Sequence, residues 1–392
     1  MHSRDLIEQY KTYVQDWRRY FHKHPELSNE EFETTKTLAK ELESMGVEVH
    51  VDEERGTGLI GIIHGEKTGK AIALRADIDA LPVQEHNTFD FKSDVDGKMH
   101  ACGHDGHMAI LLGAAKMLTS MKDRIEGDVY LAFQPAEETG AGAPAFMKFG
   151  DWLEKVDAIF GGHVWIDLPA GLISVEAGPR MAASSKITIN VKGKQGHGAQ
   201  PHQAVDAIVV ASAIVMNLQT VVSRNVSALD SLVITIGNIH SGSEWNVIPG
   251  EAQMGGTIRF FDPDKEEYYV ESIRRVVEHT ALAYGATAEL IYERKVPATI
   301  NDAAASELAE RVVIDTLGKE KLSKMRQVMP GEDFAWYLQE KPGCFAFIGI
   351  QNSEVGATFD HHNNRFTMDD SVLSAASAVY AEYAVQWLKV HK

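Results

Sequence analysis

The chain has 392 residues, more than one ordinary hydrophobic core holds, so we expect two domains. Hydrophobic residues make up 44% of the sequence and charged residues 24%, as in soluble globular proteins. The formal net charge of -18 argues against a nucleic acid or an anionic membrane surface as partner, because the field of the protein repels both. An anionic substrate would need a local Arg or Lys to overcome that field.

Cysteine usage and the N-terminus point to a reducing compartment. The two cysteines, Cys102 and Cys344, do not form a disulfide framework. The first residues are charged and lack the apolar segment of a secretory signal. No apolar run approaches the roughly 20 residues that a membrane span needs. We therefore expect a cytoplasmic protein.

The first half of the chain alternates between predicted helices and strands. Apolar spacing predicts amphipathic helices over 4–22 and 29–45, then strands at 47–51, 58–63 and 71–75. A helix follows at 107–121, with strands at 128–134 and 157–161. From 71–75 onward, each strand runs into an acidic or histidine residue. In an open α/β sheet such residues meet at the carboxyl ends of the strands, which is where these folds place their sites.

The pattern of predicted strands and helices changes near Ala182. Strands are predicted at 186–192, 231–239, 252–261 and 286–294, with helices at 204–222 and 264–284. This β-α-β-β-α-β order is the ferredoxin-like split motif. We therefore expect an inserted domain over 184–294, within a larger α/β domain of residues 1–183 and 295–392. The larger domain resumes with a helix near 303–317, a strand at 344–350 and a helix at 370–388.

A cluster of metal-ligating residue types precedes the helix at 107–121. Eight residues contain His100, Cys102, His104, Asp105 and His107. In an extended chain, side chains two residues apart point the same way, so the thiolate of Cys102 and the imidazole of His104 can meet at one point. Such a pair suits Zn²⁺ and similar transition ions. A polar helix cap with incidental histidines is the alternative interpretation.

Residues at other strand ends extend this ligand set. The candidates are Cys102, His104, Glu138, His163 and His361 or His362. Five protein ligands exceed the need of one tetrahedral ion and suit two metal ions that share a bridging carboxylate and water, an arrangement used for hydrolysis. The water also needs a base. Glu137 and Glu138 are adjacent, so one can bridge the metals while the other faces the water.

Five motifs resemble those of a known family. They are Cys-Gly-His-Asp-Gly-His, Gln-Pro-Ala-Glu-Glu, Gly-Gly-His-Val-Trp, Gly-Lys-Gln-Gly-His-Gly-Ala-Gln-Pro-His and Asn-Val-Ile-Pro-Gly. Together they resemble one branch of the two-metal aminoacylase/carboxypeptidase family, which holds bacterial aminoacylases, hippurate hydrolases and plant auxin-conjugate hydrolases. The resemblance covers essentially the whole chain. It implies a large zinc-peptidase-like α/β catalytic domain, with the insertion as a ferredoxin-like lid and dimerisation domain.

The resemblance also implies roles for individual residues. Glu137 would be the general base, and the metal ligands would be Cys102, His104, Glu138, His163 and His362. His197 resembles a histidine that reaches the partner subunit's site and stabilises the tetrahedral oxyanion. Asn246 and Arg259 resemble the residues that bind the substrate carboxylate. Arg259 is also the local cation that the acidic net charge requires.

Several positions keep more than one interpretation. The family commonly has His-x-Pro-x-Phe where this chain reads His362-Asn-Asn364-Arg-Phe366, and the adjacent His361 makes the ligand ambiguous. The spacing to Phe366 favours His362. Asp77 and Asp79 are either turn residues or groups that orient the ligands. The remaining histidines are interpreted as ordinary surface or structural ones, namely His22, His24, His50, His64 and His86.

These observations predict a two-metal amidohydrolase that cleaves N-acyl amino acids, such as N-acetyl or N-benzoyl conjugates. We expect two divalent ions per subunit, Zn²⁺ or Mn²⁺, with Co²⁺ and Ni²⁺ also compatible. We also expect a homodimer or higher homo-oligomer whose lid closes over the substrate. The alternatives are a dipeptidase or carboxypeptidase that uses the same metals, and a binding protein without chemistry.

Overall fold

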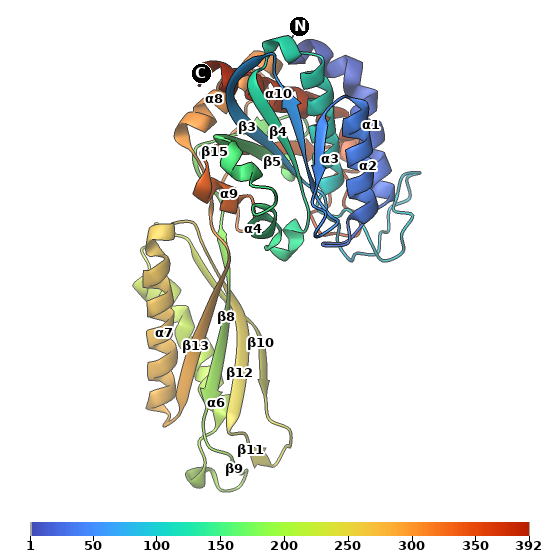
Figure 1. The fold of residues 1–392 in the computed structure, drawn as a ribbon. Helices are drawn as coiled ribbons and strands as arrows, with labels where there is room; N and C mark the ends of the chain where they lie inside the picture. Colours follow the sequence, from blue (N-terminus) through green and yellow to red (C-terminus); the bar gives the residue numbers. More distant parts are fainter. Residues whose placement is uncertain (1, 392) are drawn as a thin grey trace. The chain divides into compact units, whose positions relative to one another are not determined.

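A computed structural model describes residues 2–391, which form two compact units. The larger unit contains the chain up to Arg180, Ile300–Arg326 and the chain from Asp333 onward. The smaller unit contains Met181–Thr299 together with Gln327–Glu332, a short segment that the sequence assigned to the larger domain. Each unit has its own sheet (Figure 1).

The larger unit is built on a seven-stranded sheet of order β1-β2-β4-β3-β5-β15-β6. Its strands are β1 (Glu48–Val51), β2 (Leu59–His64), β3 (Lys67–Asp77), β4 (Glu126–Gln134), β5 (Ala158–Pro169), β6 (Ile173–Ser174) and β15 (Gly343–Gln351). The central strands β4, β3, β5 and β15 are parallel, whereas β1, β2 and β6 join antiparallel at the edges. The carboxyl ends of the four central strands therefore lie at one edge of the sheet, as the α/β prediction requires.

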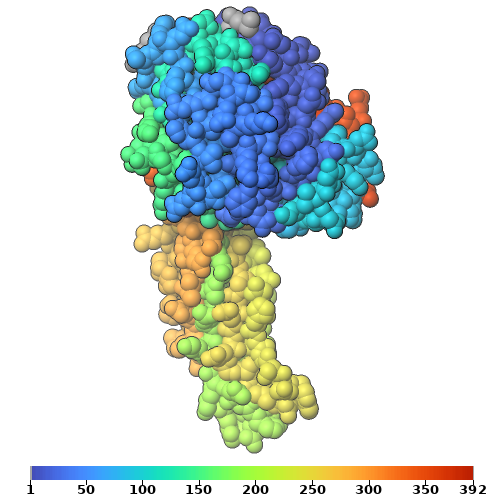
Figure 2. Space-filling model, turned by 45° about the vertical axis from the view of Figure 1, so that its right-hand side comes forward, coloured from blue at the N-terminus to red at the C-terminus, as the bar shows by residue number. Residues whose placement is uncertain are grey.

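Helices pack against this sheet in a layer of their own. The layer contains α2 (Phe32–Ser44), α3 (His104–Thr119), α8 (Ala303–Leu317) and α10 (Leu373–Val390), and α1 (Ile7–Lys23) packs on α3 and α10. Almost every residue of α3 is buried, which fits its near-continuous run of apolar residues. The N-terminal part of the chain, blue in Figure 2, forms much of one face of the larger unit.

Short elements near the strand ends were not predicted. They include α4 (Gly142–Phe146) and α5 (Trp152–Lys155), which have five and four residues, whereas the sequence does indicate a helix from about Phe334, where α9 (Ala335–Glu340) lies. So short a segment carries too few positions to show a helical period. The predicted strand at 157–161 is longer than expected, because β5 continues to Pro169. His163 therefore lies inside a strand and not beyond its end.

The smaller unit has the ferredoxin-like arrangement. Its sheet has the order β10-β12-β8-β13, with β8 (Ala183–Lys192), β10 (Leu232–Ser241), β12 (Glu251–Phe260) and β13 (Thr287–Val296). Neighbouring strands are antiparallel. The helices α6 (Ala207–Thr220) and α7 (Glu266–Ala283) contact each other and pack on the sheet (Figure 1). The chain order of these elements is the predicted β-α-β-β-α-β.

One segment of the smaller unit, Ala207–Asn225, has the length and composition of a membrane span. The expectation that no apolar run approaches this length was therefore wrong. Length and composition alone do not distinguish such a segment from the core helix of a soluble protein. In this fold α6 buries Val210, Ile214 and Leu218 and packs on the sheet of its own unit.

The close packing of β5 yields a stability prediction. A Cβ atom added to Gly161 would lie 2.7 Å from Cε2 of Phe334, whose ring is fully buried. Gly161→Ala should therefore lower the free energy of unfolding by about 1–3 kcal/mol, as overpacking does. Urea denaturation measures the loss. Gly237→Ala is the control, because the nearest atom to its new Cβ is 3.9 Å away. An equal loss in both variants would contradict the packing argument.

Candidate metal centre

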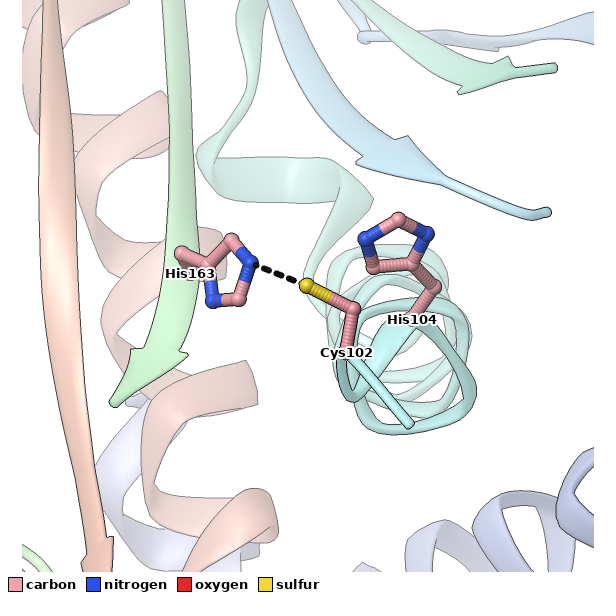
Figure 3. A group of neighbouring side chains, drawn as sticks. All are labelled: Cys102, His104 and His163. Carbon is pink, nitrogen blue, oxygen red and sulfur yellow. Dashed lines mark hydrogen bonds between the residues drawn. The ribbon is translucent and has the colours of Figure 1, made fainter. Parts of the chain in front are cut away.

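Three of the predicted ligands converge at the carboxyl edge of the larger sheet. Cys102 precedes α3, His104 begins α3, and His163 lies in β5. Each has a ligand atom within 4.8 Å of the other two. Figure 3 shows Cys102 between the two imidazoles, with its Sγ atom 3.3 Å from Nε2 of His163. This grouping of one sulfur and two nitrogens has the donor chemistry of a zinc-type site.

The turn before α3 differs from the extended chain that the sequence argument assumed. Gly103 adopts the left-handed conformation, with φ of 93°. A Cβ atom there would also lie 2.4 Å from Cγ2 of Val164. Cys102 and His104 therefore face the same point because a glycine turns the chain, and not because alternate residues of a strand share a face.

His104 has one ring nitrogen bound by protein and one without a partner. Its Nδ1 donates to the backbone oxygen of Asp79 at 2.9 Å. Its Nε2 is buried, makes no hydrogen bond within the part of the chain that the structure describes, and lies 3.9 Å from Oε1 of Glu138. That carboxylate oxygen is likewise buried and makes no hydrogen bond within residues 2–391, although Nε2 of His362 lies 3.5 Å from it. Two such buried polar atoms that make no hydrogen bond are costly in a dry site, and a cation bound between them would satisfy both.

The protonation states of His163 and Cys102 also fit a site for a bound cation. The Nδ1 of His163 donates to the backbone oxygen of Val164 at 2.6 Å, which leaves Nε2 as the atom that faces Cys102. Burial holds the pKa of His163 well below its usual value, so its imidazole is neutral. Burial and the charge of Glu138 hold the pKa of Cys102 well above its usual value. The thiolate ligand therefore forms only when a cation replaces the proton.

The structure places His362, and not His361, beside Glu138. The Nε2 of His362 lies 3.5 Å from Oε1 of Glu138, and both residues group with Cys102 within 4.8 Å. His361 instead donates from Nε2 to the backbone oxygen of Val164 at 2.9 Å. Its ring packs against aromatic rings, and burial lowers its pKa to about 4. His361 is therefore held as a neutral packing residue.

His107 carries no ligand function in this arrangement, although it belongs to the sequence cluster. Its Nδ1 donates to Oδ1 of Asp77 at 2.5 Å, and its Nε2 accepts the N–H of Val164 at 2.9 Å. Both nitrogens are thus engaged by protein. Asp105 lies elsewhere, bound to the buried His22 at 2.7 Å and to Arg18 at 3.0 Å.

The two adjacent glutamates lie on a turn that follows β4. A ligand atom of Glu137, one of Glu138 and one of His104 lie within 4.8 Å of one another. Oε1 of Glu137 accepts the N–H of Asp333 at 3.3 Å. The N–H of Glu138 donates to Oδ2 of Asp79 at 3.1 Å. Glu137 thus borders the ligand cluster, at a position where a base could reach a bound water molecule.

Asp77 and Asp79 are buried partners of the ligands, and not solvated turn residues. Asp79 binds His104 and the Glu138 amide, and Asp77 binds His107 and Arg75. Burial opposes ionisation of Asp77, but the charges of the neighbouring His104 and Arg75 and the hydrogen bond from His107 outweigh it, so its pKa lies well below its usual range. Carboxylates in this position fix the tautomer and orientation of imidazole ligands.

Sequence reasoning missed a third carboxylate of this network, Asp333. From the sequence, Asp333 would only cap a helix that begins near Phe334, but it is fully buried and accepts from Nη2 of Arg75 at 2.8 Å and from the N–H of Ala143 at 2.8 Å. The one local signal for burial was the apolar Phe334-Ala-Trp that follows it. Its partners come from distant segments, so spacing within the sequence could not have identified them.

In the smaller unit, His197 and Asn246 lie side by side. His197 ends β9 (Gly196–His197) and pairs with the first residue of β11 (Val247–Ile248). The N–H of Gly198 donates to the backbone oxygen of Asn246 at 2.8 Å. The side chain of His197 is exposed, and its Nδ1 accepts the N–H of Ala199 at 3.1 Å.

Arg259 lies in β12 of the four-stranded sheet, whereas β9 and β11 form a separate two-stranded sheet. It pairs with Ser184 at the start of β8, whereas the end of β8, Lys192, pairs with Glu251 near the Asn246 loop. Eight residues of strand separate these ends, which is roughly 25 Å. Nη1 of Arg259 donates to the backbone oxygen of Met329 at 3.0 Å, and burial lowers its pKa from the usual value. One copy of the unit therefore does not present Arg259 and Asn246 to the same carboxylate.

The geometry agrees with comparisons to known proteins. Residues 73–386 match the model of peptidase family M20/M25/M40. The chain is 42% identical over 387 residues to N-acetylcysteine deacetylase of Bacillus subtilis, covering 98% of this chain and 99% of that protein. It is 38% identical over 393 aligned positions to thermostable carboxypeptidase 1 of Saccharolobus solfataricus, with 98% and 99% covered.

A solved structure extends the agreement to the fold. The chain superposes with a TM-score of 0.87 on a dinuclear metal-binding peptidase of the M20 family from Bacillus subtilis, at 38% identity. The match covers 97% of this chain and 99% of that chain. It confirms the family resemblance drawn from the five motifs and the expectation of a two-metal α/β fold. The chain belongs to peptidase family M20/M25/M40.

Proposed function

We propose that this protein is a metal-dependent amidohydrolase that cleaves the amide bond of N-acyl amino acids, such as N-acetyl or N-benzoyl conjugates. The observation that carries the proposal is the cluster of orphaned buried ligand atoms with Glu137 beside it. The deacetylase relative supports the substrate class. The carboxypeptidase relative favours a second candidate, peptide hydrolysis at the same site.

The proposed metal ligands are Cys102, His104, Glu138, His163 and His362, which fit two divalent ions. Thiolate favours Zn²⁺ and the later transition ions, while carboxylate also accommodates Mn²⁺. Ions bound there supply Lewis acidity, which acidifies a water molecule and polarises the amide carbonyl. Glu137 takes a proton from that water and returns it to the leaving amine. The backbone N–H of Asp333 donates to the carboxylate of Glu137 and holds it at the edge of the ligand cluster.

We further propose that the active protein is a homodimer or higher homo-oligomer that works on small molecules in the cytoplasm. Arg259, a proposed partner of the substrate carboxylate, lies near the end of β12, whereas Asn246, the other, precedes Glu251 at the start of that strand. If both bind one carboxylate, they come from different copies of the chain. His197 lies beside Asn246, so a copy that supplies Asn246 would also supply His197 to stabilise the oxyanion.

Removal of the proposed base should separate chemistry from metal binding. Glu137→Gln should lower kcat by roughly 10²–10⁴-fold, the range expected for general-base catalysis, while the metal content stays near that of the wild type. Glu138→Gln is the matched comparison and should lose metal as well as activity. Turnover and metal analysis of both variants decide the roles, and retained turnover in Glu137→Gln would exclude Glu137 as the base.

Metal exchange should identify the reaction. Chelator-stripped protein should release no amine from N-acetyl, N-benzoyl or longer N-acyl amino acids, and reloading with Zn²⁺, Mn²⁺, Co²⁺ or Ni²⁺ should restore release. Dipeptides assayed in parallel test the carboxypeptidase alternative. Release from dipeptides alone would replace the proposed substrate class. No release under any metal, from protein that binds about two ions, would favour a binding protein.

Mixing two inactive variants tests whether copies share sites. One copy of the chain carries Glu137→Gln, which removes the base, and the other copy carries His197→Ala, which removes the oxyanion donor. Mixed dimers of the two should regain activity, because one of their two sites would contain neither substitution. The recovered rate after co-refolding or co-expression is the measurement. Mixtures as inactive as either parent would show that each copy uses its own His197.

A further inference from the structure

The turn that carries Glu137 and Glu138 has an unfavourable backbone. Ala136, directly before Glu137, adopts the left-handed conformation with φ of 59° and ψ of 37°. For a residue with a Cβ atom this costs about 1–2 kcal/mol. Gly142 presses on the same turn, since a Cβ atom there would lie 2.2 Å from the backbone oxygen of Pro135. The shape of the turn must therefore be imposed from outside.

Two buried carboxylates hold the turn, one on each side of Glu137. Oε1 of Glu31 accepts the N–H of Ala136 at 2.9 Å, and Oδ2 of Asp79 accepts the N–H of Glu138 at 3.1 Å. Hydrogen bonds from a backbone N–H to a carboxylate are stronger than those between neutral groups. Asp79 also binds His104, which accounts for its place in the site. Glu31 comes from the segment just before α2, far in sequence from the proposed ligands, so its contact with the turn needs a separate explanation.

Glu31 is a costly residue in its surroundings. Its side chain is fully buried, and Oε2 has no hydrogen-bond partner among residues 2–391. Burial, together with the charge of Asp79, raises its pKa to about 7. A buried carboxyl group with an unsatisfied oxygen destabilises a fold, so an apolar residue would be the more stable choice for packing alone.

The backbone of Glu31 is fixed independently of the turn. Its carbonyl oxygen accepts the N–H of Thr35 at 3.0 Å and the Oγ1 hydroxyl of Thr35 at 2.7 Å. That hydroxyl accepts the N–H of Gly58, at the start of the β2 strand, at 2.9 Å. Glu31 thus reaches the turn from a rigid support, as an element that positions a catalytic group must.

We propose that Glu31 is a positioning residue for Glu137: it accepts the N–H of Ala136 and so fixes the residue before the base. The inference rests on the proposed role of Glu137. Because Asp79 separately holds the Glu138 amide, loss of Glu31 should displace Glu137 while Glu138 keeps its place. The effect should therefore appear in kcat and leave metal binding intact.

Substitutions that keep or remove the acceptor test this inference. Glu31→Gln keeps an oxygen acceptor, whereas Glu31→Met keeps the length and removes it. Glu31→Met should lower kcat roughly 10- to 100-fold, as small misplacements of catalytic groups do, with KM and metal content changed less than about twofold. Glu31→Gln should stay within about threefold of the wild type. Glu30→Met is the matched control, since Glu30 is exposed and pairs with Lys98 at the surface.

Hydrogen–deuterium exchange gives a readout independent of turnover. Peptides that cover 134–143 should exchange faster in Glu31→Met than in Glu31→Gln or Glu30→Met. Unchanged exchange, or unchanged kcat in folded Glu31→Met, would overturn the inference. If Glu31→Met does not fold, Glu31→Asp replaces it, because the shorter side chain withdraws the acceptor. A wild type without turnover would instead refute the proposed function, and the exchange data would still decide whether Glu31 holds the turn.

Discussion

The site depends on the carboxylates at the end of β3. Asp77 and Asp79 are fully buried, and neither would ionise there without cationic or hydrogen-bonding partners. Their partners are the imidazoles of α3, so the strand end and the helix start stabilise each other's polar groups. The same contacts leave Nε2 of His104 directed at the cluster. Orientation of the ligands is therefore a by-product of satisfying buried charge.

Much of the architecture could be predicted because it follows from periodicity. The spacing of apolar residues predicts the alternation of strands and helices, the inserted β-α-β-β-α-β unit and the buried character of α3. The short helices α4 and α5 were not predictable, because their positions are set by tertiary contacts and not by a repeating pattern. The extent of β5 was underestimated, since His163 and Trp165 interrupt the apolar run but remain in the sheet.

In the candidate site, too, some residues could be predicted from the sequence and others could not. Residue type and motif predicted Cys102, His104, Glu138 and His163 as ligands, and the structure places their ligand atoms in overlapping groups of three. The spacing to Phe366 favoured His362 over His361, but the sequence could not show that His361 is bonded to the backbone of Val164. The sequence also could not predict the contacts that Glu31 and Asp333 make in the site. Each contacts segments more than 100 residues away, and neither lies in a motif that marks its role.

The peptide groups on either side of the Val164 α-carbon connect three histidines. The N–H of Val164 donates to His107, and its carbonyl oxygen accepts from His163 and His361. All three bonds involve main-chain atoms, so they do not depend on which amino acid occupies the position. Replacing the fully buried Val164 side chain would change the packing of the core but leave in place these three bonds, on which the site relies. Only changes to the backbone itself, such as a proline or an ester linkage, would reveal that dependence.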